Sequence, residues 1–162
     1  MGLATVASRA HVALEAPPVS VEVDLAGGLP SFSIVGLPET TVRESKDRVR
    51  AALRNCGFEF PPRRIIVNLA PADLPKSGGR FDLPIALGVL AASGQMAGES
   101  LQGAEFVGEL SLDGRLRPVG GSLSAAAAAA SENVTLFLPA ENGCEASLVS
   151  DARLITAPHL IA

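Results

Sequence analysis

The segment from Leu83 to Met96 is almost uncharged, and it would be apolar on nearly every side of a helix. Asp82 stands where an N-cap would, and Pro84 is tolerated in a first helical turn, so we predict a helix over 83–93. A helix without a polar face has to be covered by other elements, which a sheet of the same domain can provide. The stretch of about fourteen residues is short of the roughly 20 needed to cross a bilayer, so no membrane partner is expected.

Strand patterns precede this helix along the chain. Residues 3–14 and 19–25 alternate apolar and polar side chains around a proline turn, and residues 31–36 restart the alternation. We predict an antiparallel meander in this N-terminal third. The run Arg64–Ala70 has the length and the β-branched content of a central strand.

The rest of the chain alternates between strand and helix. A charged helix is predicted from Pro38 to Gly57, and six consecutive alanines form another over 122–131. Further predictions are a hairpin at Asp113-Gly114 between 105–110 and 115–118, strands at 134–138 and 153–156, and a turn of helix near 141–148. No repeat, linker or break in composition divides the chain, so we predict a single domain over 1–162 of the α+β class.

Composition limits the kinds of partner. The net charge is −4, which argues against a protein that binds nucleic acid through a surface that is basic throughout. The chain also has no Trp, no Tyr and only six Phe, so it has few aromatic rings on which bases could stack. Cys56 and Cys144 form no disulfide framework, and Arg9 and His11 interrupt the place where a signal peptide needs its apolar stretch. We therefore expect a cytoplasmic location.

Motifs for cofactors and for catalysis fail one by one. Lys76-Ser77 looks like the end of a phosphate loop, but Ala70 and Pro75 stand where that motif needs glycine, and no Gly-x-Gly-x-x-Gly is present. The two histidines, His11 and His159, are isolated near opposite ends, without metal-ligand spacing or a nucleophile elbow. No cofactor and no metal is expected in this chain.

Charge is unevenly distributed along the sequence. Between residues 43 and 80 there are nine basic and four acidic side chains, a net charge of +5, which leaves −9 for the rest. The basic residues are Arg43, Lys46, Arg48, Arg50, Arg54, Arg63, Arg64, Lys76 and Arg80. A domain with this polarity could meet a phosphate backbone on one side, so DNA is a candidate partner of the segment 43–80.

Within this segment, the helix and the loop after it call for different interpretations. On the helix we favour a solvated surface with internal ion pairs, Glu44 with Arg48 and Asp47 with Arg50. In the loop, Lys76 and Arg80 flank Gly78-Gly79, whose amides could donate hydrogen bonds to a phosphate. The candidate nucleic-acid-binding residues are Lys76, Arg80, Arg63 and Arg64. The alternative for Arg80 is structural, an ion pair with Asp73 or Asp82 that fixes the loop.

Two motifs, Gly36–Thr40 and the long run Val67–Ala86, resemble the ComM/YifB family, bacterial proteins often labelled magnesium-chelatase-like. The resemblance covers essentially the whole chain and points to the N-terminal domain of that family. It implies a fold similar to the proteolytic domain of Lon. It also implies a hexameric AAA+ ATPase module, C-terminal to this chain and not present in it, that would hold ATP and magnesium. The family includes a helicase that promotes branch migration during natural transformation.

A Lon-type protease needs a Ser nucleophile and a Lys base within hydrogen-bonding reach. Lys76-Ser77-Gly78 matches the opening of the nucleophile motif, but the position of the serine falls at Arg80 or Phe81. Leu123, Ser124 and Ala125 follow the Gly-Gly after which the lysine should come. Adjacent side chains on an extended segment diverge, so Lys76 and Ser77 are not expected to form the pair.

These expectations combine into one functional hypothesis and two alternatives. The hypothesis is a non-proteolytic accessory domain of a hexameric AAA+ ATPase that remodels DNA, with roles in DNA engagement and in assembly with its own copies. Helicase activity would belong to the parent protein, and no enzymatic activity is expected for this chain. The alternatives are a protein-interaction or oligomerisation module without DNA contact, and a regulatory part of a magnesium-chelatase-like ATPase.

Overall fold

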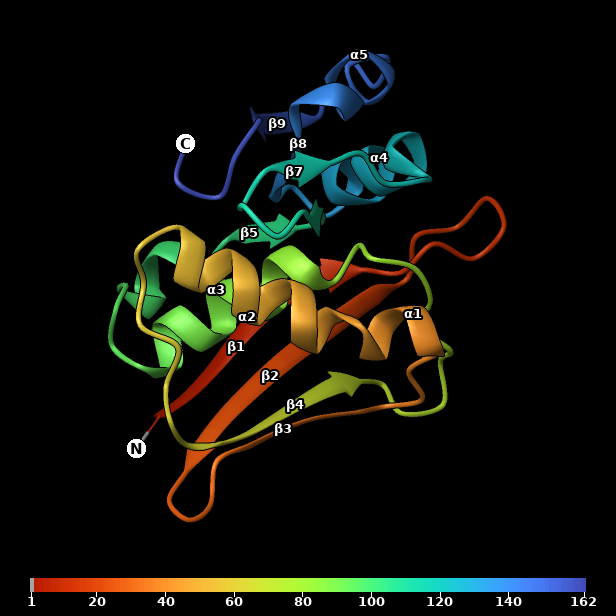
Figure 1. Cartoon of the computed structure of the whole chain (residues 1–162). Helices are drawn as coiled ribbons and strands as arrows, with labels where there is room; N and C mark the ends of the chain where they lie inside the picture. The colour runs from red at the N-terminus through yellow and green to blue at the C-terminus, as the bar shows by residue number, and fades with distance from the viewer. Residues whose placement is uncertain (1) are drawn as a thin grey trace.

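The computed structural model describes residues 2–162, which form a seven-stranded sheet with helices packed on it and a separate small hairpin (Figure 1). The sheet has the strand order β3-β4-β2-β1-β5-β8-β9. Its strands are β1 (Gly2–Arg9), β2 (Pro18–Ala26), β3 (Ser31–Val35), β4 (Arg64–Ala70), β5 (Ala104–Phe106), β8 (Thr135–Pro139) and β9 (Arg153–Ala157). The hairpin pairs β6 (Glu109–Leu110) with β7 (Leu116–Arg117). The helices are α1 (Thr40–Arg43), α2 (Ser45–Asn55), α3 (Asp82–Ala92), α4 (Ser122–Ser131) and α5 (Gly143–Ala146), with the 3-10 turns η1 (Gly98–Leu101) and η2 (Ala140–Asn142).

Four of the six strand pairs in the sheet are parallel, and only β1–β2 and β2–β4 are antiparallel. The domain is therefore a mixed α/β domain with a mostly parallel sheet, which corrects the α+β assignment. The predicted meander is confirmed for β1 and β2 and wrong for β3, which pairs in parallel with β4. β3 leaves Ser31, Ser33 and Val35 exposed, as an edge strand can, whereas β4 is partly or fully buried beyond its first residue and takes the inner position between β3 and β2.

Helix α3 packs on β1 and β2, as its apolar sequence predicts, and α2 packs against α3 (Figure 1). The approach to the sheet is close, because a Cβ atom on Gly88 would lie 2.4 Å from a methyl carbon of Val23. The predicted N-cap at Asp82 is wrong. Asp82 lies in the first turn of α3, and its buried carboxylate bonds to other elements instead of to the helix end.

The second half of the sheet is covered by α4, which contacts β8, β9 and α5. Three alanines of α4 (Ala125, Ala126 and Ala129) are buried there in a small second core. The predicted hairpin is shorter than expected, since Ala104–Phe106 joins the main sheet as β5 between β1 and β8. The predicted helix 38–57 is divided at Glu44 into α1 and α2.

No helix within residues 2–162 is both long enough and apolar enough to span a membrane.

Candidate nucleic-acid interface

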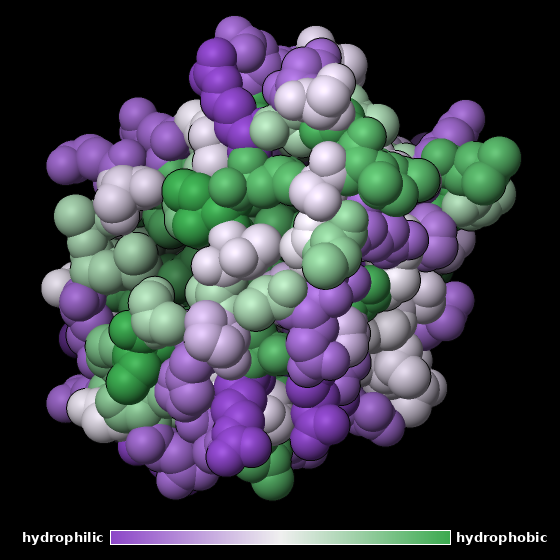
Figure 2. Space-filling view, turned by 90° about the horizontal axis from the view of Figure 1, so that it is seen from above, coloured by the Kyte–Doolittle hydropathy of each residue, from purple (hydrophilic) through white to green (hydrophobic). Residues whose placement is uncertain are grey.

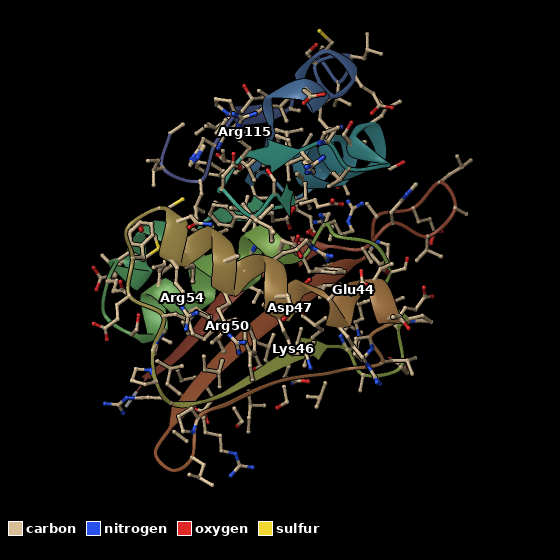
Figure 3. All side chains as sticks on the ribbon, viewed as in Figure 1. Glu44, Lys46, Asp47, Arg50, Arg54 and Arg115 are labelled. Carbon is tan, nitrogen blue, oxygen red and sulfur yellow. The ribbon has the colours of Figure 1, made fainter. Side chains whose placement is uncertain are left out.

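Helix α2 presents three basic side chains on one side. Val49, Ala52 and Leu53 are fully buried and fix the inner face of the helix against the core. Lys46, Arg50 and Arg54 repeat every four residues, a spacing that places side chains above one another on a helix. Figure 3 shows the three residues in a row along α2, on the side of the helix toward β4 and β3 in that view.

Phe60 holds two of these arginines in place. The guanidinium carbons of Arg50 and Arg54 lie 5.1 and 5.9 Å from the centre of its ring, within the range of a cation–π contact. The Phe60 ring lies 5.6 Å, centre to centre, from the ring of Phe32 in the core. Phe60 therefore anchors the two cationic groups to the body of the domain and lowers the entropy that they would lose on binding a ligand.

A shallow hollow of about 250 Å³ lies beside this contact. Ser31, Arg50, Arg54, Phe60 and Arg63 line it together with three prolines. Arg63 and Arg64, two of the candidates from the sequence, are exposed, and Arg64 opens β4 next to β3. The structure thus gathers Arg50, Arg54 and Arg63 around one hollow, the kind of surface that can contact successive phosphates.

Lys76 does not belong to this surface. Its side chain is 0% exposed, and the ammonium group donates hydrogen bonds to the carbonyl of Gly36, at 2.6 Å, and to that of Pro71. Burial lowers the pKa of Lys76, against the opposing charge of Asp73. Lys76 therefore links the loop after β3 to the loop after β4. Because its ammonium group is enclosed by protein, it is not available to contact DNA.

Arg80 is also buried, with 5% of its surface exposed. Its Nε donates to the carbonyl of Arg9 at 2.8 Å and its Nη1 donates to that of Gly120 at 2.7 Å. It pairs with neither Asp73 nor Asp82, and no carboxylate within residues 2–162 lies within 4.0 Å of its guanidinium. Arg80 is therefore not placed for contact with DNA. It has structural contacts, but with the carbonyls of Arg9 and Gly120 and not with Asp73 or Asp82.

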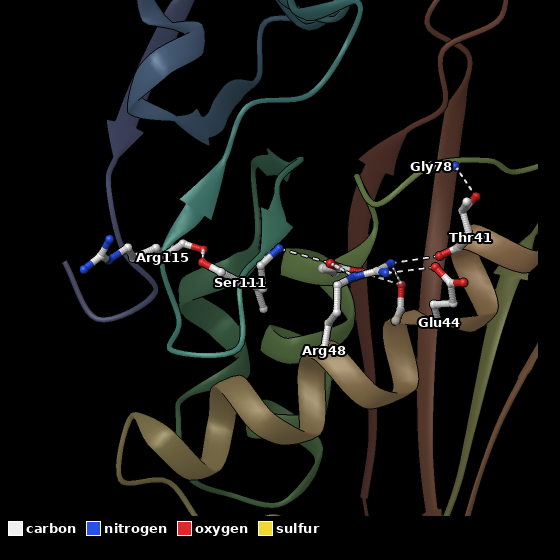
Figure 4. Close-up of polar contacts among 9 residues, drawn as sticks. Thr41, Glu44, Arg48, Gly78, Ser111 and Arg115 are labelled. Carbon is white, nitrogen blue, oxygen red and sulfur yellow. Dashed lines mark hydrogen bonds and ion pairs between the residues drawn. The ribbon is translucent and has the colours of Figure 1, made fainter.

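Asp82, one of the two acids that the sequence suggests for Arg80, binds Arg48 instead. Figure 4 shows Arg48 among its polar contacts, which include Glu44 and Thr41. Arg48 Nε lies 2.6 Å from Asp82 Oδ2, and the carboxylate also accepts from Ser45 Oγ at 2.5 Å and from the amide of Leu110 at 3.0 Å. Burial raises the pKa of Asp82, while its bonds to Arg48, Ser45 and Leu110 oppose that rise. The cluster joins α2, α3 and β6 and sets the position of the basic face of α2.

The sequence predicts two ion pairs along the basic helix. Glu44 and Arg48 do pair, at 3.4 Å, whereas Asp47 and Arg50 form no ion pair in the described chain. Arg50 faces Phe60 instead. From the charge pattern alone, Arg50 and Arg54 are predicted to lie on a solvated surface, so they are absent from the predicted nucleic-acid-binding residues. Sorting the basic residues by helical face would have separated Lys46, Arg50 and Arg54 from Arg48.

The geometry around Ser77 bears on peptidase chemistry. The ammonium of Lys76 bonds to backbone carbonyls, and Ser77 is exposed on the next residue, so the two side chains point apart. Across residues 2–162 there is also no group of three or more His, Cys, Asp or Glu residues placed to hold a metal ion.

Comparison with known proteins gives consistent matches. The model of the family described as "ChlI: Subunit ChlI of Mg-chelatase" matches residues 21–142. The chain is 53% identical to "Competence protein ComM" of Haemophilus influenzae over 161 residues, and 49% and 48% identical to "Uncharacterized protein YifB" of Salmonella typhimurium and of Escherichia coli over 160 residues. Each alignment covers 99% of this chain but 32% of the relative, so the chain spans about a third of the length of these proteins.

Proposed function

The chain belongs to the ComM/YifB family, its residues 21–142 match the family model of the magnesium-chelatase subunit ChlI, and on this premise we propose that it engages DNA for a larger ATPase. In this proposal the chain is a non-proteolytic, Lon-like accessory domain of a hexameric AAA+ machine that remodels DNA during competence. The domain guides DNA and packs against its own copies, while ATP and magnesium are bound by another part of the parent protein.

The observation that carries the proposal is the basic face of α2 and its surroundings, comprising Lys46, Arg50, Arg54, Arg63 and Arg64. None of these residues has a carboxylate partner within 4.0 Å in the part of the chain that the structure describes. Unpaired cations that are held close together favour binding of a polyanion and release of its counterions. The face offers one anchored aromatic ring, so it supports backbone contact rather than reading of bases.

The remaining charges suit an orientation on DNA. Outside residues 43–80 the net charge is −9, so a phosphate backbone would be attracted to one side of the domain and repelled by the rest. Such a polarity explains how a domain with a net charge of −4 can engage DNA through one face.

The first prediction concerns the triple variant Arg50→Gln, Arg54→Gln and Arg63→Gln. It should weaken binding to forked and four-way DNA by roughly tenfold or more, and it should reduce the slope of log K against log salt by about one for each phosphate that is no longer neutralised. Glutamine keeps much of the packing on Phe60 while it removes the charge. Fluorescence anisotropy over a series of salt concentrations measures both quantities.

The matched control is Arg115→Gln, Arg117→Gln and Arg153→Gln, which changes the net charge by the same amount. All three residues are exposed, and Figure 3 shows Arg115 on a different part of the molecule from Lys46, Arg50 and Arg54. The control should retain affinity and slope. Equal weakening by the two triple variants would reduce the effect to net charge and contradict a defined DNA-binding face.

A second candidate function is assembly without DNA contact, and the apolar end of the domain favours it. Seen from the end that carries β9 and α5, the surface has hydrophobic residues gathered between hydrophilic ones (Figure 2). β9 is an edge strand with free backbone groups on one side, and Ile155 on it is 47% exposed. Edges and apolar patches of this kind are where chains pair with one another.

The variant Ile155→Lys tests this alternative. If β9 is an assembly surface, a charge at its centre should lower any self-association of the chain, measured by light scattering after size exclusion, and leave DNA affinity unchanged. Thr156→Lys, on the same strand and also exposed, is the control for an added charge beside the patch. Self-association that is indifferent to Ile155→Lys would exclude this surface.

A further inference from the structure

A second hollow, distinct from the basic face, lies where three separate loops meet. Its volume is about 250 Å³, and it is lined by His11, by residues 77–80, by Glu109 at the start of β6 and by residues 118–120. It is open to solvent at His11, Ser77, Gly78 and Gly120, all exposed, and Arg80 lines it as a buried residue. None of its lining residues belongs to the proposed DNA-binding face.

Arg80 brings a charge to this hollow that has no carboxylate partner within residues 2–162. Two of its nitrogens donate to carbonyls, but its buried Nη2 makes no hydrogen bond. Burial lowers the pKa of Arg80 to about 10, which still leaves the guanidinium charged at neutral pH. A buried cation without a counter-charge is costly, and an anion in the hollow that Arg80 lines would supply the missing charge.

Glu109 places a carboxylate beside the same hollow. A Cβ atom on Gly79 would lie 2.4 Å from Glu109 Oε1, so the carboxylate occupies the space over this glycine. Glu109 forms no ion pair or side-chain hydrogen bond within residues 2–162; the charged group that it influences is Arg48, which is already bonded to Asp82. Its oxygens are therefore free to accept a hydrogen bond, and they repel an anion that has no hydrogen to offer.

Arg80 and Glu109 together restrict which ligands the hollow can bind. We propose that the hollow binds a phosphoryl group in its hydrogen-bearing form, in which the unpaired charge of Arg80 attracts the P–O⁻ oxygens and Glu109 accepts a hydrogen bond from the P–OH. A hydrogen bond to an ionised carboxylate is stronger than one between neutral groups. Ser77, His11 and the amide of Gly79 line the same space and can donate to the remaining oxygens. Sulfate has the same shape but carries no hydrogen at neutral pH, so it cannot satisfy Glu109.

Thermal unfolding of the chain at pH 6.5 and constant ionic strength tests the proposal, with inorganic phosphate and sodium sulfate as probes. Phosphate should raise Tm by several degrees at saturation, and sulfate should raise it much less, because a ligand that binds only the folded state stabilises it. In Glu109→Gln the amide can donate, so the preference for phosphate over sulfate should fall by about tenfold or more. Equal effects of the two anions on the unaltered chain would overturn the proposal.

A pair of aspartate variants separates the site from general effects of charge. At Gly120 a side chain has room beside His11, with 3.6 Å to the nearest atom, and its carboxylate would supply Arg80 with a counter-charge. Gly120→Asp should raise Tm in the absence of phosphate and abolish the response to phosphate. Gly98→Asp is the control, since nothing lies within 4 Å of a Cβ atom there. A phosphate response that persists in Gly120→Asp would place any binding elsewhere and overturn the proposal.

The source of the phosphoryl group is distinguished by a further arm, in which a nucleoside 5′-monophosphate competes with inorganic phosphate. Tighter binding of the ester supports the site and identifies an ester as its ligand, and tighter binding of the free ion supports the site and identifies inorganic phosphate.

The hollow and the DNA-binding face share no residue. The variant with Arg50, Arg54 and Arg63 replaced by glutamine should therefore keep its full response to phosphate, so the two proposals can fail separately.

Discussion

Glu105→Ala should lower the free energy of unfolding by about 3–5 kcal/mol, because it leaves the guanidinium of Arg9 buried without its principal counter-charge. Arg9 and Glu105 form a two-pronged ion pair, with Nε to Oε1 at 2.7 Å and Nη2 to Oε2 at 2.9 Å, and both side chains are almost fully buried. Burial by itself lowers the pKa of Arg9, but the bonds and charges of Glu105 and Glu132 outweigh that effect and hold the pKa above its ordinary value.

The position of this pair adds to its importance. Arg9 ends β1, and Glu105 lies in β5, the strand that joins the N-terminal half of the sheet to β8 and β9. β1 and β5 share a short parallel register centred on Ala7 and Glu105. The ion pair therefore supports the junction between two parts of one sheet, and urea unfolding should show the loss of Glu105 as a lower midpoint.

Glu132 supplies the control for this prediction. It also pairs with Arg9, at 2.7 Å, but its side chain is 49% exposed. Because exposed ion pairs contribute about 0–1 kcal/mol, Glu132→Ala should cost far less than Glu105→Ala. The double variant Arg9→Met with Glu105→Leu should recover a large part of the loss, since it removes both charges together. A cost for Glu105→Ala no greater than that for Glu132→Ala would contradict a dominant role for the buried pair.

How far the sequence predicts the fold can be judged from single elements. β4, α4 and the apolar helix α3 have patterns strong enough to place them, and they occur where predicted. The pairing of β3 could not be predicted, because alternation identifies a strand but does not say which neighbour it takes. β4, rather than β3, lies beside β2, because β4 is apolar at five of its seven positions and needs an inner position in the sheet.

The candidate site was predicted only in part, for a related reason. Charge counting located the basic segment and its exposed residues Arg63 and Arg64. It cannot separate exposed cations from buried ones, so it selects Lys76 and Arg80 for DNA contact, although both are buried and bonded to carbonyl groups. Carbonyls contributed by Gly36 and Gly120 have no signature in the sequence, since every residue has one.

Asp82→Ala should also lower the free energy of unfolding by about 3–5 kcal/mol, because it removes the centre of a buried polar cluster. Without this carboxylate, Arg48 loses its closest counter-charge, and Ser45 and the amide of Leu110 lose their acceptor. Asp82→Asn keeps the shape and one acceptor, so its cost should be smaller, about 1–3 kcal/mol. Guanidinium chloride unfolding measures both variants.

Glu44→Ala tests whether burial, rather than the number of ion pairs, sets these energies. Glu44 pairs with the same Arg48, at 3.4 Å, but its side chain is 58% exposed, so its removal should cost only about 0–0.5 kcal/mol. Hydrogen exchange adds a local readout. Asp82 holds the first turn of α2 through Ser45 and Arg48, so amides in this turn should exchange faster in Asp82→Ala than in Glu44→Ala. Lys46 lies in that turn, and Arg50 and Arg54 follow it on the same side of the helix, so the cluster around Asp82 also orients the basic face. Similar exchange rates in the two variants would show that α2 is held in place without the Asp82 cluster.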